Sequence, residues 1–143
     1  MLVASKNENF LDQNIDWEFP IPIAYGPGRL SEIGMFCEQF QISNPLIITD
    51  EGSKNLPFIN RLITLLQKAS IPSKLFFGVS PNPRDDEIMA GCETYRSGKH
   101  DSIIAIGGGS AMDGAKAIGM TVNSGANLWD FEYRKPSPKI GSK

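Results

Sequence analysis

The sequence predicts an α/β fold, in which an open and mostly parallel sheet carries helices on both faces. Short apolar segments, such as residues 46–49 and 102–106, have the composition of strands that are buried on both sides. The segments between them place apolar residues at helical spacing. Strands and helices therefore alternate along the chain, which is typical of parallel sheets with right-handed connections.

The first predicted element is a strand or extended arm over residues 16–25, where every second residue is apolar. Pro20 and Pro22 lack backbone N–H donors, so this strand is expected at the edge of the sheet. After a turn at residues 26–28 the spacing predicts a helix, and its inward stripe comprises Leu30, Ile33, Cys37 and Phe40.

The second predicted strand, residues 46–49, ends at Asp50. A helix follows, with Asn55 as its N-cap and Pro57 in its first turn. Its apolar stripe comprises Ile59, Leu62, Ile63 and Leu66. A third strand is expected over residues 74–77.

The third predicted helix follows a loop, Pro81-Asn82-Pro83, that two prolines make rigid. Three acidic residues, Asp85, Asp86 and Glu87, fall in its first turn, where the helix dipole favours negative charge. Its stripe comprises Ile88, Cys92 and Tyr95. The fourth strand, residues 102–106, leads into a last helix, which turns Ala111, Ala115, Ile118 and Val122 inward. Residues 133–143 are polar and are expected to form a loop.

The composition is that of a folded domain without a general positive charge. The chain has 143 residues and a net charge of −2, and 37 of its residues are Leu, Ile, Val or Phe. Disorder and nucleic-acid binding are therefore not expected. No apolar run approaches the about 20 residues of a membrane span, and residues 1–9 lack the centre of a signal peptide. Cys37 and Cys92 lie in helical patterns and are expected to be reduced and packed, in a cytoplasmic protein.

The chain contains one histidine, His100, which is expected on the surface at the amino end of the fourth strand. A catalytic zinc or iron site takes about two or three imidazoles. This chain therefore cannot build such a site from imidazoles alone.

The junction between the fourth strand and the last helix is the most informative feature. It reads Gly107-Gly108-Gly109-Ser110. Three glycines let a ligand approach the backbone closely, because no Cβ stands in the way. The helix after them presents unpaired N–H groups and the positive end of its dipole, and a phosphate is the natural ligand of such a terminus.

Two known phosphate-binding motifs do not match this junction. The pattern G-x-G-x-x-G from Gly107 would need glycine where Met112 stands, and a P-loop from Gly109 would need lysine where Ala115 stands. The alternative is a tight turn without a ligand, in which Ser110 is the N-cap and Asp113 completes a capping box.

Two further polar residues follow strands and are expected beside this junction, because ligands of open parallel sheets bind beyond the carboxyl ends of the strands. Asp50 can bind ribose hydroxyls there and would repel a 2′-phosphate, which favours NAD over NADP. The alternative is that Asp50 only caps its own turn. Asn82 can present its amide to the same crevice, or it can belong to an ordinary turn.

Five stretches of the chain, taken in order, are similar to the motifs of one enzyme family. They are Phe19-x-x-Pro22 with Tyr25-Gly26-x-Gly28, Leu46-Ile47-Ile48-Thr49-Asp50-x-Gly52, Val79-x-Pro81-Asn82-Pro83, the segment from Asp101 through Gly107-Gly108-Gly109-Ser110-x-x-Asp113 to Lys116, and Trp129-Asp130-Phe131. Together they resemble the iron-containing (group III) alcohol dehydrogenases of the dehydroquinate synthase-like superfamily, whose N-terminal domain is Rossmann-like. The resemblance runs from about residue 17 to residue 131.

The resemblance implies a dinucleotide site. It places Asp50 near the adenosine ribose, Gly108, Gly109 and Ser110 around the pyrophosphate, and Asp113 near the nicotinamide. The complete set of cofactor-binding residues that it implies is Asp50, Asn82, Gly108, Gly109, Ser110, Ala111, Met112 and Asp113. NAD is the expected cofactor, although the family also has members that use NADP.

The resemblance also implies a reaction, which is reversible hydride transfer between an alcohol and an aldehyde or ketone. Iron, or zinc in some members, polarises the substrate oxygen, and its ligands belong to a helical C-terminal domain. That metal-binding domain is absent from these 143 residues, so the chain is expected to be a truncated form that is inactive alone. The implied organisation is an extension over residues 1–15, a dinucleotide-binding domain over 16–132 and a polar loop over 133–143, with no catalytic or metal-binding residue.

Two alternatives stay open. The chain can be a non-catalytic nucleotide-binding module that acts through a partner, either a separate metal domain or a second copy of itself. It can also belong to a glycerol or sugar-phosphate dehydrogenase, or to a dehydroquinate synthase. The substrate is not defined, because the residues around it would lie largely outside this chain.

Overall fold

The computed structural model describes residues 15–18, 21–136 and 138. Its centre is a parallel sheet in which β3 (Pro45–Asp50) lies between β4 (Lys74–Val79) and β5 (Ser102–Ala105). The register pairs Ile47 of β3 with Leu75 on one side and with Ile104 on the other. The predicted parallel α/β sheet is therefore confirmed, and β4 is two residues longer than the pattern indicated.

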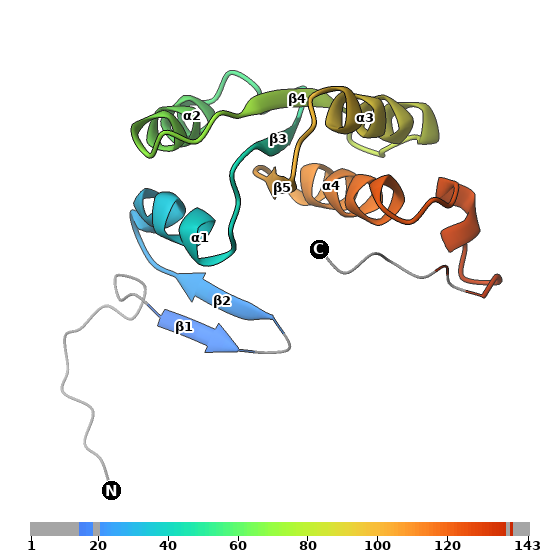
Figure 1. Cartoon of the computed structure of the whole chain (residues 1–143), viewed down its shortest axis with the longest axis horizontal. Coiled ribbons are helices and arrows are strands. Elements are labelled where there is room, and N and C mark those ends of the chain that lie inside the picture. Colours follow the sequence, from blue (N-terminus) through green and yellow to red (C-terminus); the bar gives the residue numbers. More distant parts are fainter. Residues whose placement is uncertain (1–14, 19–20, 137, 139–143) are drawn as a thin grey trace, which may run out of the picture.

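Helices cover both faces of this sheet (Figure 1). On one face lie α1 (Ile33–Gln39) and α2 (Pro57–Lys68), and on the other lie α3 (Asp85–Ser97) and α4 (Gly109–Val122). The side chain of Ile47 packs with α1 and α2, whereas those of Leu46 and Ile48 pack with α3 and α4. Because β3 feeds both cores, its first five residues are all buried, which explains why it is apolar without alternation.

The segment predicted as one edge strand, residues 16–25, is instead a hairpin. β1 (Ile15–Glu18) and β2 (Pro22–Tyr25) pair antiparallel and form a separate two-stranded sheet. An alternation of period two is common to one long strand and two short ones, so it could not reveal the reversal. Pro22 stands at the last pair of the ladder, opposite Glu18, where a missing N–H interrupts no inner bond. Phe19 and Pro20 lie outside the described residues.

The predicted helices are present, but two of their boundaries differ. A 3-10 turn at Arg29–Glu32 precedes α1, which ends at Gln39, so Phe40 lies beyond the helix and is 64% exposed. The N-cap of α2 is Leu56 and not Asn55. Since the residue before a proline is held in extended backbone, Pro57 sets this boundary at Leu56.

The short helix η3 (Leu128–Phe131) follows α4 and contacts α3, where the indole Nε1 of Trp129 donates to a carboxylate oxygen of Asp85 at 3.2 Å. Beyond it, residues 133–136 and 138 form neither helix nor strand. Within the described residues, no helix is long and apolar enough to cross a bilayer.

Asp101 joins two loops at the amino end of the sheet. Its carboxylate accepts hydrogen bonds from the backbone N–H and hydroxyl of Ser43, at 2.7 and 2.6 Å, and from the N–H of Asn44 at 3.0 Å. Burial opposes the ionisation of Asp101, but the hydrogen bonds from Ser43, Ser102 and Asn44 outweigh it and lower the pKa from 3.8 to about 2.

The prediction that His100 lies on the surface is wrong. The ring is buried, packs against Tyr95 with the ring centroids 6.1 Å apart, and has Nδ1 3.0 Å from the carbonyl oxygen of Asn44. Its Nε2 is enclosed without a hydrogen-bond partner among the described residues. The neighbouring Gly98 leaves the room that the ring occupies. Cys37 and Cys92 are buried and free, as expected.

Replacing Asp101 by Asn should lower the free energy of unfolding at pH 7, because a neutral amide accepts these hydrogen bonds less strongly. A carboxylate with a lowered pKa stabilises the fold above its unfolded pKa and loses that effect as the pH falls through its folded pKa. The deficit of Asp101→Asn should therefore shrink between pH 4 and pH 2 in urea unfolding experiments. The exposed Asp113, which forms an ion pair with Lys116 at 3.6 Å, is the control, and Asp113→Asn should change stability by less than about 0.5 kcal/mol. A deficit of Asp101→Asn that is equal at both ends of this pH range would contradict the assignment.

Candidate functional site

The strand order creates a crevice at the carboxyl end of the sheet. The chain passes from β3 through α2 to β4 on one side, and then returns through α3 to β5 on the other side of β3. After β3 the chain leaves toward one face of the sheet, and after β5 it leaves toward the other (Figure 1). Ligands of open α/β sheets bind at such points of reversal, where the two connections diverge.

A pocket of about 300 Å³ lies at this point. It is lined by Asp50, Ser53, Pro81, Gly108, Gly109 and Ser110. These residues lie at or just after the carboxyl ends of β3, β4 and β5, so the ends of all three parallel strands meet at the pocket. The structure thus brings together Asp50 and the glycine-rich junction, which are nearly 60 residues apart in the sequence.

Asp50 is held by the turn that follows it. One carboxylate oxygen accepts the backbone N–H of Ser53 at 3.0 Å, and the other accepts the Ser53 hydroxyl at 2.8 Å. Asp50 therefore does cap its own turn, and it also lines the pocket. A carboxylate has about four lone-pair positions, so two bonds to Ser53 leave it able to accept further donors.

The N-terminus of α4 forms the other wall of the pocket. The helix begins at Gly109 with Gly108 as its N-cap, and no side chain caps it. The carbonyl of Gly108 accepts the N–H of Met112 at 3.2 Å. The N–H groups of Gly109, Ser110 and Ala111 come before that first helical bond and have no acceptor within the helix.

Ser110 is not the N-cap of α4. The alternative prediction of a tight turn capped by Ser110 and Asp113 is therefore wrong. The Ser110 hydroxyl instead donates to the carbonyl oxygen of Pro81 at 2.7 Å. This bond ties α4 to the loop between β4 and α3. Because the helix starts one residue before Ser110, Asp113 is not in a capping position either, and it forms an exposed ion pair with Lys116.

Glu87 gives the loop between β4 and α3 its shape. Its carboxylate accepts the backbone N–H of Arg84 at 3.0 Å, and the backbone N–H and hydroxyl of Ser80 at 3.2 and 3.0 Å. The pKa of Glu87 is lowered, and the hydrogen bond from the Arg84 N–H is the largest cause. The hydrogen bonds from Ser80 lower the pKa further, whereas desolvation raises it. Glu87 therefore holds both ends of the loop that presents Pro81 to Ser110, because Ser80 precedes this loop and Arg84 follows it.

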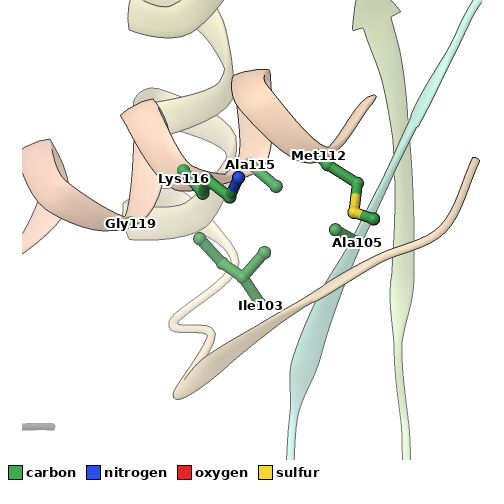
Figure 2. A pocket seen from close by; sticks show the side chains of 6 residues that line it. All are labelled: Ile103, Ala105, Met112, Ala115, Lys116 and Gly119. Carbon is green, nitrogen blue, oxygen red and sulfur yellow. The ribbon is translucent and has the colours of Figure 1, made fainter. Parts of the chain in front are cut away.

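The other predicted cofactor residues lie around the pocket without lining it. The side chain of Asn82 is exposed, and its backbone carbonyl accepts a hydrogen bond from the Ser80 hydroxyl at 3.0 Å. Ala111 is fully buried, so only its backbone N–H can face a ligand. The side chain of Met112 lies over β5, where Figure 2 shows it beside Ala105 in a second pocket.

Sequence reasoning missed three residues of this site. Ser53 anchors Asp50, Pro81 lines the pocket and Glu87 closes the loop. The spacing of Asp50 and Ser53 is that of a side chain that caps a turn, so this contact could have been predicted. The bond from Ser110 to Pro81 could not, because it joins residues 29 positions apart.

No metal centre is formed by the described part of the chain. Among residues 15–18, 21–136 and 138, no group of three or more His, Cys, Asp or Glu side chains could hold a metal ion. The pocket presents the carboxylate of Asp50 on one side and the backbone donors at the N-terminus of α4 on the other.

Comparison with known proteins gives consistent relatives. A family profile described as iron-containing alcohol dehydrogenase matches residues 20–142. Alcohol dehydrogenase 4 of Schizosaccharomyces pombe is 34% identical over 115 residues, which are 80% of this chain and 27% of that protein. NADH-dependent butanol dehydrogenase A of Clostridium acetobutylicum is 32% identical over 119 residues, which are 82% of this chain and 30% of that protein.

A solved structure shows the same fold. The sulfoacetaldehyde reductase from Bifidobacterium kashiwanohense, determined in complex with NAD+, superposes with a TM-score of 0.70 at 28% identity, over 79% of this chain and 30% of that one. The chain thus spans less than a third of the length of these relatives. Because the family profile matches most of its residues, the chain belongs to the iron-containing alcohol dehydrogenase family.

Proposed function

We propose that this chain binds NAD(H) and supplies the nucleotide-binding part of a metal-dependent alcohol dehydrogenase. The observation that carries the proposal is the convergence of Asp50 with the open N-terminus of α4 at the point where the strand order reverses. Two relatives support the proposal. One is named as an NADH-dependent butanol dehydrogenase, and the other, a sulfoacetaldehyde reductase, was solved in complex with NAD+.

The N-terminus of α4 fits a pyrophosphate. Apart from its chain neighbours and the backbone of α4 itself, a Cβ added to Gly108 or Gly109 would meet no described atom within 4 Å, so the space beside the backbone is open. None of the six lining residues is cationic. The negative charge would therefore be held by the N–H groups of Gly109, Ser110 and Ala111 and by the helix dipole.

Asp50 fits the ribose of the adenosine. Its free lone pairs would accept the 2′- and 3′-hydroxyls, and its negative charge would repel the phosphate that NADP carries at the 2′ position. The bonds from Ser53 hold the carboxylate in place before a ligand arrives, which lowers the entropic cost of binding. This arrangement supports NAD as the preferred cofactor.

Gly107 lets the two halves of the site come together. Its φ of +141° is unfavourable for other residues, and an added Cβ would lie 3.0 Å from the Ala111 Cβ and 3.1 Å from Oδ2 of Asp50. It would also lie 3.3 Å from the hydroxyl oxygen of Thr49, a buried atom without a hydrogen-bond partner among the described residues. Close approach of β3 and β5 at their ends therefore requires glycine here.

Bound NAD would supply the nicotinamide ring that accepts or donates the hydride. The residues of this chain would bind and orient the dinucleotide: Asp50 at the ribose, Gly108, Gly109 and Ser110 at the pyrophosphate, and Asp113 toward the nicotinamide. Asn82 and Met112 belong to the same proposal, as outer residues of the site. The metal would be held by residues outside those described, and the chain alone is proposed to be inactive. The boundaries proposed for the dinucleotide-binding domain are residues 16 and 132.

Calorimetric titration tests the cofactor. NADH should bind the chain, NADPH should bind at least about tenfold more weakly, and Asp50→Ser should weaken NADH binding while reducing this difference, because the repulsion of the 2′-phosphate is lost. Asp86→Ser, which removes an exposed carboxylate of α3 outside the pocket, is the control and should leave both affinities unchanged. Absence of heat and of any thermal shift with either nucleotide at millimolar concentration would refute the proposal.

Two glycine variants distinguish an effect on the stability of the fold from an effect on NADH binding. Gly107→Ala should lower the free energy of unfolding by about 1–3 kcal/mol, because it adds backbone strain and close contacts. Gly109→Ala has no neighbour to clash with and should keep the unfolding midpoint, yet weaken NADH binding because its methyl group enters the pocket. Thermal unfolding and calorimetry of both variants provide the measurement. Wild-type NADH affinity in a folded Gly109→Ala variant would argue against this position for the pyrophosphate.

A further inference from the structure

The turn that follows β3 carries a cation close to Asp50. Lys54 is the nearest lysine or arginine to Asp50 in the sequence, and it comes directly after Ser53, which holds the Asp50 carboxylate. A lysine at such a place can act in two ways. Directed into the pocket, its ammonium would offset the charge of Asp50 and attract a 2′-phosphate. Held elsewhere, it would leave the repulsion by Asp50 in force.

The ammonium of Lys54 is held outside the pocket, whose lining includes neither Lys54 nor its two partners. It forms an ion pair with the carboxylate of Glu51, three residues earlier in the same turn. It also lies over the ring of Phe77 in β4, 4.7 Å from the ring centroid. A cation is attracted to the negative face of an aromatic ring. As a result, the side chain of Lys54 is only 30% exposed.

The position of Phe77 determines on which face of the sheet the ammonium is held. The preceding residue, Phe76, packs in the core of α3 and α4, whereas Leu75 packs with α1 and α2. Since side chains alternate along a strand, Phe77 points to the same face as Leu75. The helix α4, whose N-terminus is proposed to bind the pyrophosphate, packs on the opposite face. Lys54 is therefore held on the face of the sheet that α4 does not cover.

The charges around the pocket follow from this arrangement. Of the six residues that line it, Asp50 alone is charged. On the loop opposite, Arg84 forms ion pairs with Asp86 at 3.2 Å and with Glu87 at 3.5 Å. A phosphate beside Asp50 would have to take Arg84 or Lys54 from a carboxylate before either cation could bind it.

We propose that Lys54 is a specificity-determining residue of the nucleotide site, because its retention by Glu51 and Phe77 keeps a cation from the 2′-phosphate of NADP. The inference rests on the proposed function and deepens it. A cation–π contact and an exposed ion pair are each weak, so the loss of one should change the affinity for NADP a few-fold. Asp50 sets the preference for NAD, and the retention of Lys54 sustains it.

Calorimetry with NADH and NADPH tests this role in an Asp50→Ser background, in which the repulsion of the 2′-phosphate is already removed. In that background Phe77→Leu should raise the affinity for NADPH about threefold, because it frees the ammonium, and should leave the affinity for NADH unchanged. The gain should vanish when Lys54→Met is added. It should also decrease in about 0.5 M salt, since a freed ammonium acts through its charge.

Phe40→Leu in the same background is the matched control, because Phe40 is an exposed phenylalanine beyond the end of α1, and it should change neither affinity. A general loss of stability would affect both nucleotides alike, so the ratio of the two affinities is the readout. An unchanged ratio in Phe77→Leu, or an equal gain with and without Lys54, would overturn the inference although NADH binds. Failure of the wild-type chain to bind NADH would instead refute the proposed function, and the inference with it.

Discussion

The burial of the first five residues of β3 is the constraint on which the rest of the structure depends. This strand is the only one in the described sheet with a neighbour on each side, and its side chains enter both cores. Helices on both faces must therefore pack against it, and the connections after β3 and β5 must diverge at its carboxyl end. The position of Asp50 is a consequence of this arrangement, because it is the first residue of β3 that reaches the surface.

The pocket is shaped more by backbone than by side chains. Glycines at the start of α4 keep its first N–H groups open, and Gly107 allows the ends of β3 and β5 to approach. The hydrogen bond from Ser110 to Pro81 and the contacts of Glu87 then fix the loop opposite. Such a site is suited to binding and orienting a charged ligand.

The edge of the sheet at β5 is open. Within the described residues, β5 has an unpaired edge beside an apolar groove, although parallel sheets are normally covered on all apolar surfaces. The pocket proposed to bind the nucleotide lies at the carboxyl ends of the strands, whereas the groove lies along the side of β5.

The sequence by itself determined the order of strands and helices from β3 to α4, the two-sided burial of β3 and the residue types at the glycine-rich junction, because these depend on local periodicity and local chemistry. Only the tertiary structure decided the features that join distant segments. The alternation of residues 16–25 was compatible with one strand or two, and pairing decided for the hairpin. His100 looked like a surface residue beside a strand, but Asn44 and Tyr95 enclose it. Ser110 had the sequence of a cap, and its hydroxyl instead reaches Pro81, since a hydrogen bond forms with whichever acceptor the fold brings nearest.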